Sequence, residues 1–350
     1  MSECEEAARI GDLELLKRLH KEGKVWGEKT IPHAAMNGHL ECLRYSHENG
    51  CEWTTYTCEW AAMNGKLDCL KYAHENGCTW SFSTCVFAAR DGHLECLKYA
   101  HENGCEWNRY TCSYASQNGH LECLKYAHEN GCEWDTTTCN YAAHNGNLEC
   151  LKYAHENGCE WNFYTCSNSV MNGHLDCLKY AHENGCEWDT TTCIFSAKYG
   201  HLDCLKYAHE NGCEWDIWVC VFAAQYGKLE CLKYAHENGC PWDTDTCNYA
   251  ARNGHLECFK YLYEEWSKKN DFQSFWNRQY DLSKIIDNID LNNWWWRKSL
   301  FEVDLSSQPL LQQKVNDKKR EIEEIKSECM EGLKDILSVD IIKYCICPYV

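Results

Sequence analysis

The sequence predicts an all-α protein, an α-solenoid of short helix-turn-helix repeats, because two series of glycines recur along it at a fixed spacing. One series recurs every 27 residues without insertion, at Gly11, Gly38, Gly65, Gly92, Gly119, Gly146, Gly173, Gly200, Gly227 and Gly254. The other has the same spacing from Gly50 to Gly239, with Gly23 one period earlier. Such a period is typical of solenoids in which each repeat packs mainly on its neighbours. We expect about ten repeats between the N-terminus and Trp266.

The first helix of each repeat is expected to begin directly after a repeated tryptophan. The residues at that position all belong to the types that favour a helix N-cap: Thr54, Ser81, Asn108, Asp135, Asn162, Asp189, Asp216 and Asp243. In the repeat over residues 135–161, Cys139, Ala142 and Ala143 then fall on one helical face. Gly146 is predicted to end this helix in a left-handed conformation.

The second helix of the same repeat is predicted over residues 147–155. Its expected inner face consists of Leu148, Leu151 and Ala154, with Cys150 and Tyr153 beside them. Gly158, which follows Asn157, is expected to end this helix as Gly146 ends the first.

Two stretches, AARNGHLECFKYLYEEW and AAMNGKLDCLKYAHENGC, resemble ankyrin repeats, whose second helix reads G-H-L-E-V-V-K-L-L-L-E-N-G-A-D. The resemblance covers residues 1–266 and implies a stack of helix pairs that binds other proteins. Ankyrin repeats have about 33 residues, whereas these have 27, and the missing residues fall where the family has its β-hairpin finger. The helix stack is therefore expected here, and the long finger is not.

Charge and motifs exclude several classes of function. The net charge of −19 opposes binding to a nucleic-acid backbone or to an anionic membrane surface. The sequence has no P-loop, nucleophile elbow or dinucleotide glycine motif, and identical repeats do not build one asymmetric active site. We expect a monomer that is not an enzyme and needs no cofactor.

The N-terminal stretch MSECEEAARIGDLELL is acidic and lacks the basic start and apolar run of a signal peptide. No stretch approaches the roughly 18 apolar residues of a membrane helix. With 29 cysteines in such a chain, we expect free thiols in a reducing, cytoplasmic environment.

Three cysteines recur in each full repeat, typified by Cys123, Cys132 and Cys139, and packing as small apolar residues is the favoured interpretation. Equivalent cysteines of adjacent repeats would lie about 8–10 Å apart, beyond the roughly 7 Å Cα limit for a disulfide. Only a link between different positions, such as Cys132 with Cys139, remains open. A metal site at His128 and Cys132 is disfavoured, because Gly131 interrupts the helix and zinc requires four ligands.

His128 and its equivalents end the second helices, near the negative pole of the helix dipole. They are expected to form a ladder of histidines hydrogen-bonded to neighbouring backbone.

The positions that vary between repeats are the candidates for partner binding. Variation concentrates just after the N-caps, where the side chains are expected to be exposed, and at the end of the first helix. Tyr, Trp and Arg are typical anchors of protein interfaces. The candidate partner-binding residues are Tyr56, Phe82, Arg109, Tyr110, Phe163, Tyr164, Ile217, Trp218, Arg90, Lys198 and Arg252. The aromatic position before the paired alanines is instead expected to belong to the core between repeats. Acidity along the repeats favours a basic or polar protein segment as partner.

Residues 267–350 are predicted to form a helical capping or interaction region. Trp294, Trp295 and Trp296 are expected to cover the end of the solenoid, and an amphipathic helix is predicted over 310–337. The final LSVDIIKYCICPYV faintly resembles the start of an F-box-type segment, with Ser338 in place of the expected proline. The leading hypothesis is a non-catalytic protein-binding scaffold, and the alternative is a substrate-recruiting adaptor of a ubiquitin ligase.

Overall fold

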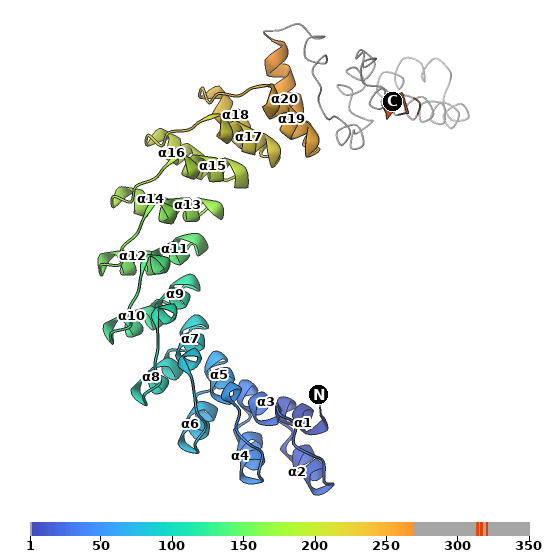
Figure 1. Ribbon diagram of the computed structural model, residues 1–350, viewed down its shortest axis with the longest axis vertical. Coiled ribbons are helices and arrows are strands. Elements are labelled where there is room, and N and C mark those ends of the chain that lie inside the picture. The colour runs from blue at the N-terminus through green and yellow to red at the C-terminus, as the bar shows by residue number, and fades with distance from the viewer. Residues whose placement is uncertain (1, 269–312, 315, 318–319, 321–350) are drawn as a thin grey trace, which may run out of the picture. The chain divides into compact units, whose positions relative to one another are not determined.

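The computed structural model describes residues 2–268 together with residues 313, 314, 316, 317 and 320. In residues 2–268 all regular structure is helical and is arranged as ten successive helix pairs (Figure 1). The chain divides into two compact units, residues 1–188 and residues 189–350. The predicted fold class is confirmed: each pair is one repeat, and no strand replaces the missing finger in the part of the chain described.

The first unit contains the pairs α1 (Glu3–Ile10) and α2 (Leu13–Lys21), α3 (Thr30–Asn37) and α4 (Leu40–Glu48), α5 (Thr55–Met63) and α6 (Leu67–Glu75), α7 (Phe82–Arg90) and α8 (Leu94–Glu102), α9 (Arg109–Gln117) and α10 (Leu121–Glu129), α11 (Thr136–Asn145) and α12 (Leu148–Glu156), and α13 (Phe163–Met171) and α14 (Leu175–Glu183). The second unit contains α15 (Thr190–Tyr199) and α16 (Leu202–Glu210), α17 (Ile217–Gln225) and α18 (Leu229–Glu237), and α19 (Thr244–Arg252) and α20 (Leu256–Ser267).

The predicted N-caps start the first helices. In α9 the backbone N–H of Tyr110 donates to Asn108 Oδ1 at 3.0 Å, which satisfies a donor that the helix itself leaves unpaired. Thr54 differs, because its side chain makes no capping bond to the backbone and its Oγ1 lies 3.4 Å from Thr57 Oγ1. The other predicted caps accept such a bond.

The two recurring glycines end the helices as predicted. Gly146 has φ 74° and Gly158 has φ 86°, both in the left-handed region. In each case the next residue bonds back across the helix end: Asn147 N–H donates to Ala142 O, and Cys159 N–H to Ala154 O, both at 2.9 Å. The chain therefore reverses sharply after each helix, which keeps the repeats short.

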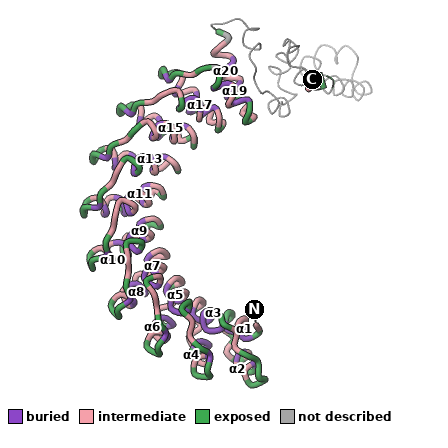
Figure 2. The backbone as a smooth tube through the Cα atoms, in the orientation of Figure 1, coloured by how far each residue is buried: buried purple, intermediate pink, exposed green. Residues whose placement is uncertain are grey.

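Most buried apolar residues of the first unit form one connected core that runs from Cys4 to Cys177. Figure 2 shows this burial along the helices, whereas exposed residues gather in the turns after the second helices. One detail differs from the prediction. In α12 the inner face is Cys150, Leu151 and Ala154, whereas Leu148 is only half-buried. Leu148 is the first residue of α12, and its side chain points toward the helix N-terminus, where no preceding turn covers it.

The last described repeat differs from the others. Helix α20 has 12 residues, and Phe259 and Leu262 are fully buried within it. Of the helix predicted over 310–337, residues 313, 314, 316, 317 and 320 are helical. Trp294, Trp295, Trp296 and the F-box-like segment 338–350 lie outside the described residues, and the domain boundary at 266 stays a prediction.

Candidate partner-binding surface

The first helices of successive repeats form a row in each unit. In the first unit this row lies on the inner side of the curve, and the second helices line the outer side (Figure 1). Neighbouring first helices also pack more closely than neighbouring second helices. Within each unit, every first helix therefore packs along the next, which gives the residues after the N-caps a rigid base.

All six of the predicted partner-binding aromatics are exposed on this row. In the first unit the exposed fraction runs from 38% for Phe163 to 54% for Tyr164, and in the second unit Trp218 is 46% exposed. Ile217 differs from the prediction because it is half-buried. We call these exposed residues the first-helix strip: Tyr56, Phe82, Tyr110, Phe163 and Tyr164 in the first unit, and Trp218 in the second.

The aromatic position before the paired alanines supports the strip. It was expected in the core between repeats, yet these rings are only half-buried. The ring centres of Tyr110 and Tyr114 lie 5.9 Å apart, and the Tyr56–Trp60 and Trp218–Phe222 pairs have 5.8 Å separations. Residues four apart share one helix face, whereas the two alanines that follow face the neighbouring helix. This spacing was present in the sequence and could have identified the second row of rings.

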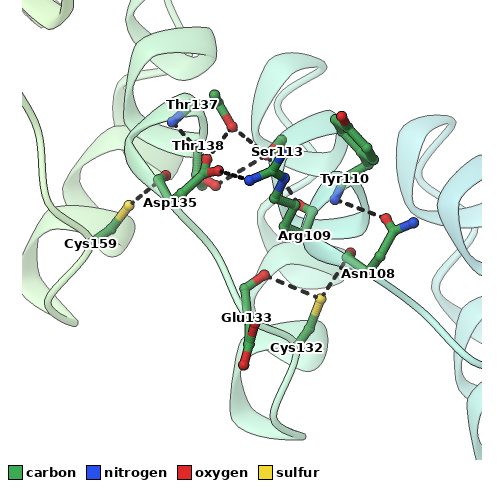
Figure 3. Close-up of polar contacts among 10 residues, drawn as sticks. All are labelled: Asn108, Arg109, Tyr110, Ser113, Cys132, Glu133, Asp135, Thr137, Thr138 and Cys159. Atoms are coloured by element: carbon green, nitrogen blue, oxygen red, sulfur yellow. Dashed lines mark hydrogen bonds and ion pairs between the residues drawn. The ribbon is translucent and has the colours of Figure 1, made fainter.

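Arg109 connects two consecutive first helices. Its Nη1 lies 3.0 Å from Oδ2 of Asp135, the N-cap of α11, and its guanidinium lies 5.5 Å from the centre of the Tyr110 ring (Figure 3). Burial raises the pKa of Asp135, but the hydrogen bonds from Thr137 and the charge of Arg109 outweigh it, so the pKa lies below its ordinary value. Arg109 is thus a bridge between repeats as well as a candidate contact.

A polar seam fixes the same two helices beneath Arg109. Ser113 Oγ donates to Arg109 O at 3.0 Å and lies 2.9 Å from Thr137 Oγ1 (Figure 3). Ser116 Oγ donates to Thr138 O at 2.9 Å. Because these bonds set the register of α9 on α11, Arg109 and Tyr110 project from a preorganised surface.

The other predicted cations lie at the far ends of the first helices. The Arg90 guanidinium lies 4.8 Å from the centre of the Phe87 ring and pairs with Asp91 at 2.8 Å. Lys198 Nζ lies 5.2 Å from the centres of both the Tyr199 and Tyr226 rings. Arg252 is exposed. Arg90 and Lys198 thus extend the aromatic surface with cations positioned over rings.

The histidines differ from the prediction. His128 contacts side chains rather than backbone: its Nδ1 lies 3.2 Å from Tyr153 Oη in the next repeat, and its ring stacks on Trp134 at 3.7 Å. The tryptophan folds back from the turn onto the helix end, so its ring covers the imidazole. Burial lowers the pKa of the equivalent His101 and His155, which favours the neutral ring. The ladder is thus a packing motif of the second helices.

The cysteines of residues 2–268 are buried, as predicted. All 26 cysteines of residues 2–268 are free thiols in the structure. The link that the sequence left open is wrong, because Cys132 lies against Cys112, and Cys139 against Cys159. In the described residues no group of three or more His, Cys, Asp and Glu side chains is placed to hold a metal ion, so His128 and Cys132 do not form part of one.

Two family models of ankyrin repeats match the chain. A family model described as "Ankyrin repeats (3 copies)" matches residues 58–138, 85–165 and 112–192, and one described as "Ankyrin repeats (many copies)" matches residues 220–262. No curated protein matches the chain. The crystal structure of the human ASB11 ankyrin repeat domain is similar at 22% identity and a TM-score of 0.41, over 46% of this chain and 85% of that one. Within the described residues no helix is long and apolar enough to cross a bilayer.

Proposed function

The chain belongs to the ankyrin repeat family, whose members generally mediate protein–protein interactions, and from this premise we propose a non-catalytic scaffold that binds a partner polypeptide through the first-helix strip. The partner is a basic or polar protein segment. The protein acts in a reducing, cytoplasmic compartment, which its 29 cysteines favour.

One observation supports this assignment above the others. In the described residues, the large apolar side chains that stay exposed are Ile10, Val25, Tyr56, Phe82, Tyr110, Phe163, Tyr164, Tyr199, Trp218 and Tyr226. From Tyr56 onward every one of them lies on a first helix or directly at its end. Packing of the repeats does not explain why these side chains gather on the first helices, because other residues form the buried core of each repeat. Clustered exposed aromatics mark a surface that another protein covers.

Charge supports the chemistry of the partner. The chain has a net charge of −19, and several N-caps beside the strip are carboxylates, such as Asp189 and Asp216. Complementary charge steers association and excludes acidic competitors. A basic or polar segment would place its charges against these caps and its side chains against the rings.

Site-specific photo-cross-linking tests the proposal. A benzoylphenylalanine in place of Tyr110 should cross-link to a discrete polypeptide when the full chain is exposed to cell extract. The matched control places benzoylphenylalanine at Lys125 instead. Lys125 lies on the second helix of the same repeat and pairs with Glu122 at 2.9 Å. Equal yields of the same adduct from both positions would contradict the proposal.

A further inference from the structure

Each full repeat brings two of its three thiols together. In the repeat that begins at Asn108, Cys112 lies on α9 and Cys132 lies in the turn after α10. Cys132 Sγ donates to Asn108 O at 3.3 Å (Figure 3), and Cys112 Sγ donates to Cys132 O at 3.9 Å. Cys112 Sγ thus lies against the backbone of Cys132, and Cys132 Sγ lies against the N-cap of the helix that carries Cys112. Both sulfur atoms therefore lie where the N-terminal part of α9 meets the turn after α10.

The arrangement recurs with a constant separation of 20 residues. We call each such couple of buried thiols, one on the first helix and one in the turn after the second, a thiol pair. The pairs are Cys58 with Cys78, Cys85 with Cys105, Cys112 with Cys132, Cys139 with Cys159, Cys166 with Cys186, Cys193 with Cys213, and Cys220 with Cys240. Packing alone does not require sulfur at both positions.

The two thiols of a pair have different chemistry. The hydrogen bond from Cys112 lowers the pKa of Cys132, because it stabilises the Cys132 thiolate, and the same bond raises the pKa of Cys112. The third cysteine of the repeat, Cys123, has its pKa raised to about 11, chiefly by burial. Since the thiolate is the nucleophile, the turn cysteine is the thiol that would react first.

We propose that each thiol pair is an oxidation site at which a peroxide converts the two thiols into a disulfide within the repeat. The turn sulfur attacks one peroxide oxygen, the O–O bond breaks, and a sulfenic acid and one water form. The first-helix sulfur then attacks the sulfenic sulfur, its proton leaves with the hydroxyl group as a second water, and the S–S bond forms. Two thiols are oxidised by two electrons, and hydrogen peroxide is reduced to water.

The disulfide would join the start of the first helix to the turn after the second. It would close a loop that contains both helices of one repeat and would restrict the unfolded chain. Repeat proteins open one repeat at a time, so closed repeats would resist local opening. The oxidised chain should lose amide protection more slowly than the reduced chain.

The chain provides a natural control. In the repeat that ends with Cys51, the position 20 residues earlier holds Ile31 in place of a cysteine. Cys51 is also buried, at 6% exposed against 3% or less for the turn cysteines of the pairs. This repeat therefore keeps a buried turn cysteine and lacks the second sulfur.

Cysteine mapping of the native full chain tests the proposal. The reduced protein would be treated with graded hydrogen peroxide, unfolded in denaturant with N-ethylmaleimide, digested and analysed by mass spectrometry. Peptides of Cys112 and Cys132 should be joined, with a loss of about 2 Da per pair, whereas Cys51 and Cys123 should be alkylated. The proposal is overturned if Cys112 and Cys132 are both recovered alkylated after a peroxide treatment that oxidises free glutathione. It is also overturned if Cys132 forms a disulfide with a cysteine of another repeat.

Two variants complete the test. Cys112→Ala should leave Cys132 without a disulfide while the other pairs close, and Cys123→Ala should leave every pair able to close. Disulfide formation in the other repeats of the same molecule would show that the Cys112→Ala chain is folded. Circular dichroism checks the fold independently. If the other pairs do not close in a folded Cys112→Ala chain, the pairs do not act independently and the proposal is wrong.

Discussion

Arg109 and Asp135 tie together the starts of two consecutive first helices, with 3.0 Å between Nη1 and Oδ2. The carboxylate has two roles, because Asp135 Oδ1 also accepts the capping bond from the Thr137 N–H at 2.9 Å. The capping bond fixes where α11 begins, and the ion pair holds Arg109, and with it the start of α9, in position. The candidate partner-binding surface and the stability of the repeat thus both involve Asp135.

These two roles can be separated at Asp135. At pH 7 Asp135→Asn keeps a capping oxygen and should lose only the contribution of the charge. Asp135→Ala also loses the cap, which should cost about a further 1 kcal/mol in urea unfolding. The lowered pKa of Asp135 means that its charge stabilises the fold above the unfolded value of about 3.9, and this contribution is lost as the pH falls through the folded pKa. Asp135→Asn should remove that part of the acid dependence. Equal midpoints for the Ala and Asn variants would contradict the capping role.

The buried face of the second helix gives a second prediction. Leu151→Ala should destabilise the protein by about 2–5 kcal/mol, because Leu151 is fully buried. Leu148→Ala, in the same helix and of the same chemistry, should cost clearly less because Leu148 is half-buried. Urea unfolding followed by circular dichroism measures both. A larger loss from Leu148→Ala would show that the assigned inner face is wrong.

The two helix-ending glycines should respond differently to alanine. Gly158→Ala should cost about 1–2 kcal/mol, which is the strain of an alanine in the left-handed conformation. No steric cost is added, because no atom lies within 4 Å of an added Cβ. Gly146→Ala should cost more, because its Cβ would also collide with the His174 ring in the next repeat. Thermal unfolding of both variants measures the difference. Equal losses would mean that the imidazole moves aside without cost.

Histidine burial predicts a loss of stability in acid. Because burial lowers the pKa of His155, the unfolded chain takes up the proton first, and stability falls as the pH drops below about 6.5. The decline ends below the folded pKa of His155. His155→Gln should flatten this part of the profile, and NMR titration should place the His155 pKa below that of an unfolded peptide. A value at or above the peptide's would contradict the burial argument.

Features that depend on one repeat were predictable from the sequence, whereas those between repeats were only partly so. Asn108 and Gly146 act locally, so their residue types were sufficient. Tyr153 lies 25 residues beyond His128, and no local rule pairs them. The thiol pairs were not predicted, because the two cysteines of a pair lie 20 residues apart on different elements of one repeat and no local rule joins them.

The candidate partner-binding surface was likewise predictable within one repeat and less so between repeats. That Tyr110 and Trp218 are exposed followed from their place after a cap, but the ion pair of Arg109 with Asp135 depends on how closely α9 and α11 pack. Helix packing distance varies with the side chains at the contact. Sequence spacing alone did not determine whether Arg109 was free or paired.

The partner affinity of strip variants tests the central claim most directly. Once a cross-linked segment is identified, its dissociation constant would be measured by calorimetry for the wild type, for Tyr110→Ala and for Lys125→Ala. Truncating an interface anchor typically costs about 2 kcal/mol or more, so Tyr110→Ala should weaken binding roughly thirtyfold with helicity unchanged. Lys125→Ala should bind as the wild type does. Wild-type affinity in the Tyr110→Ala chain, or an equal loss in both variants, would contradict the account.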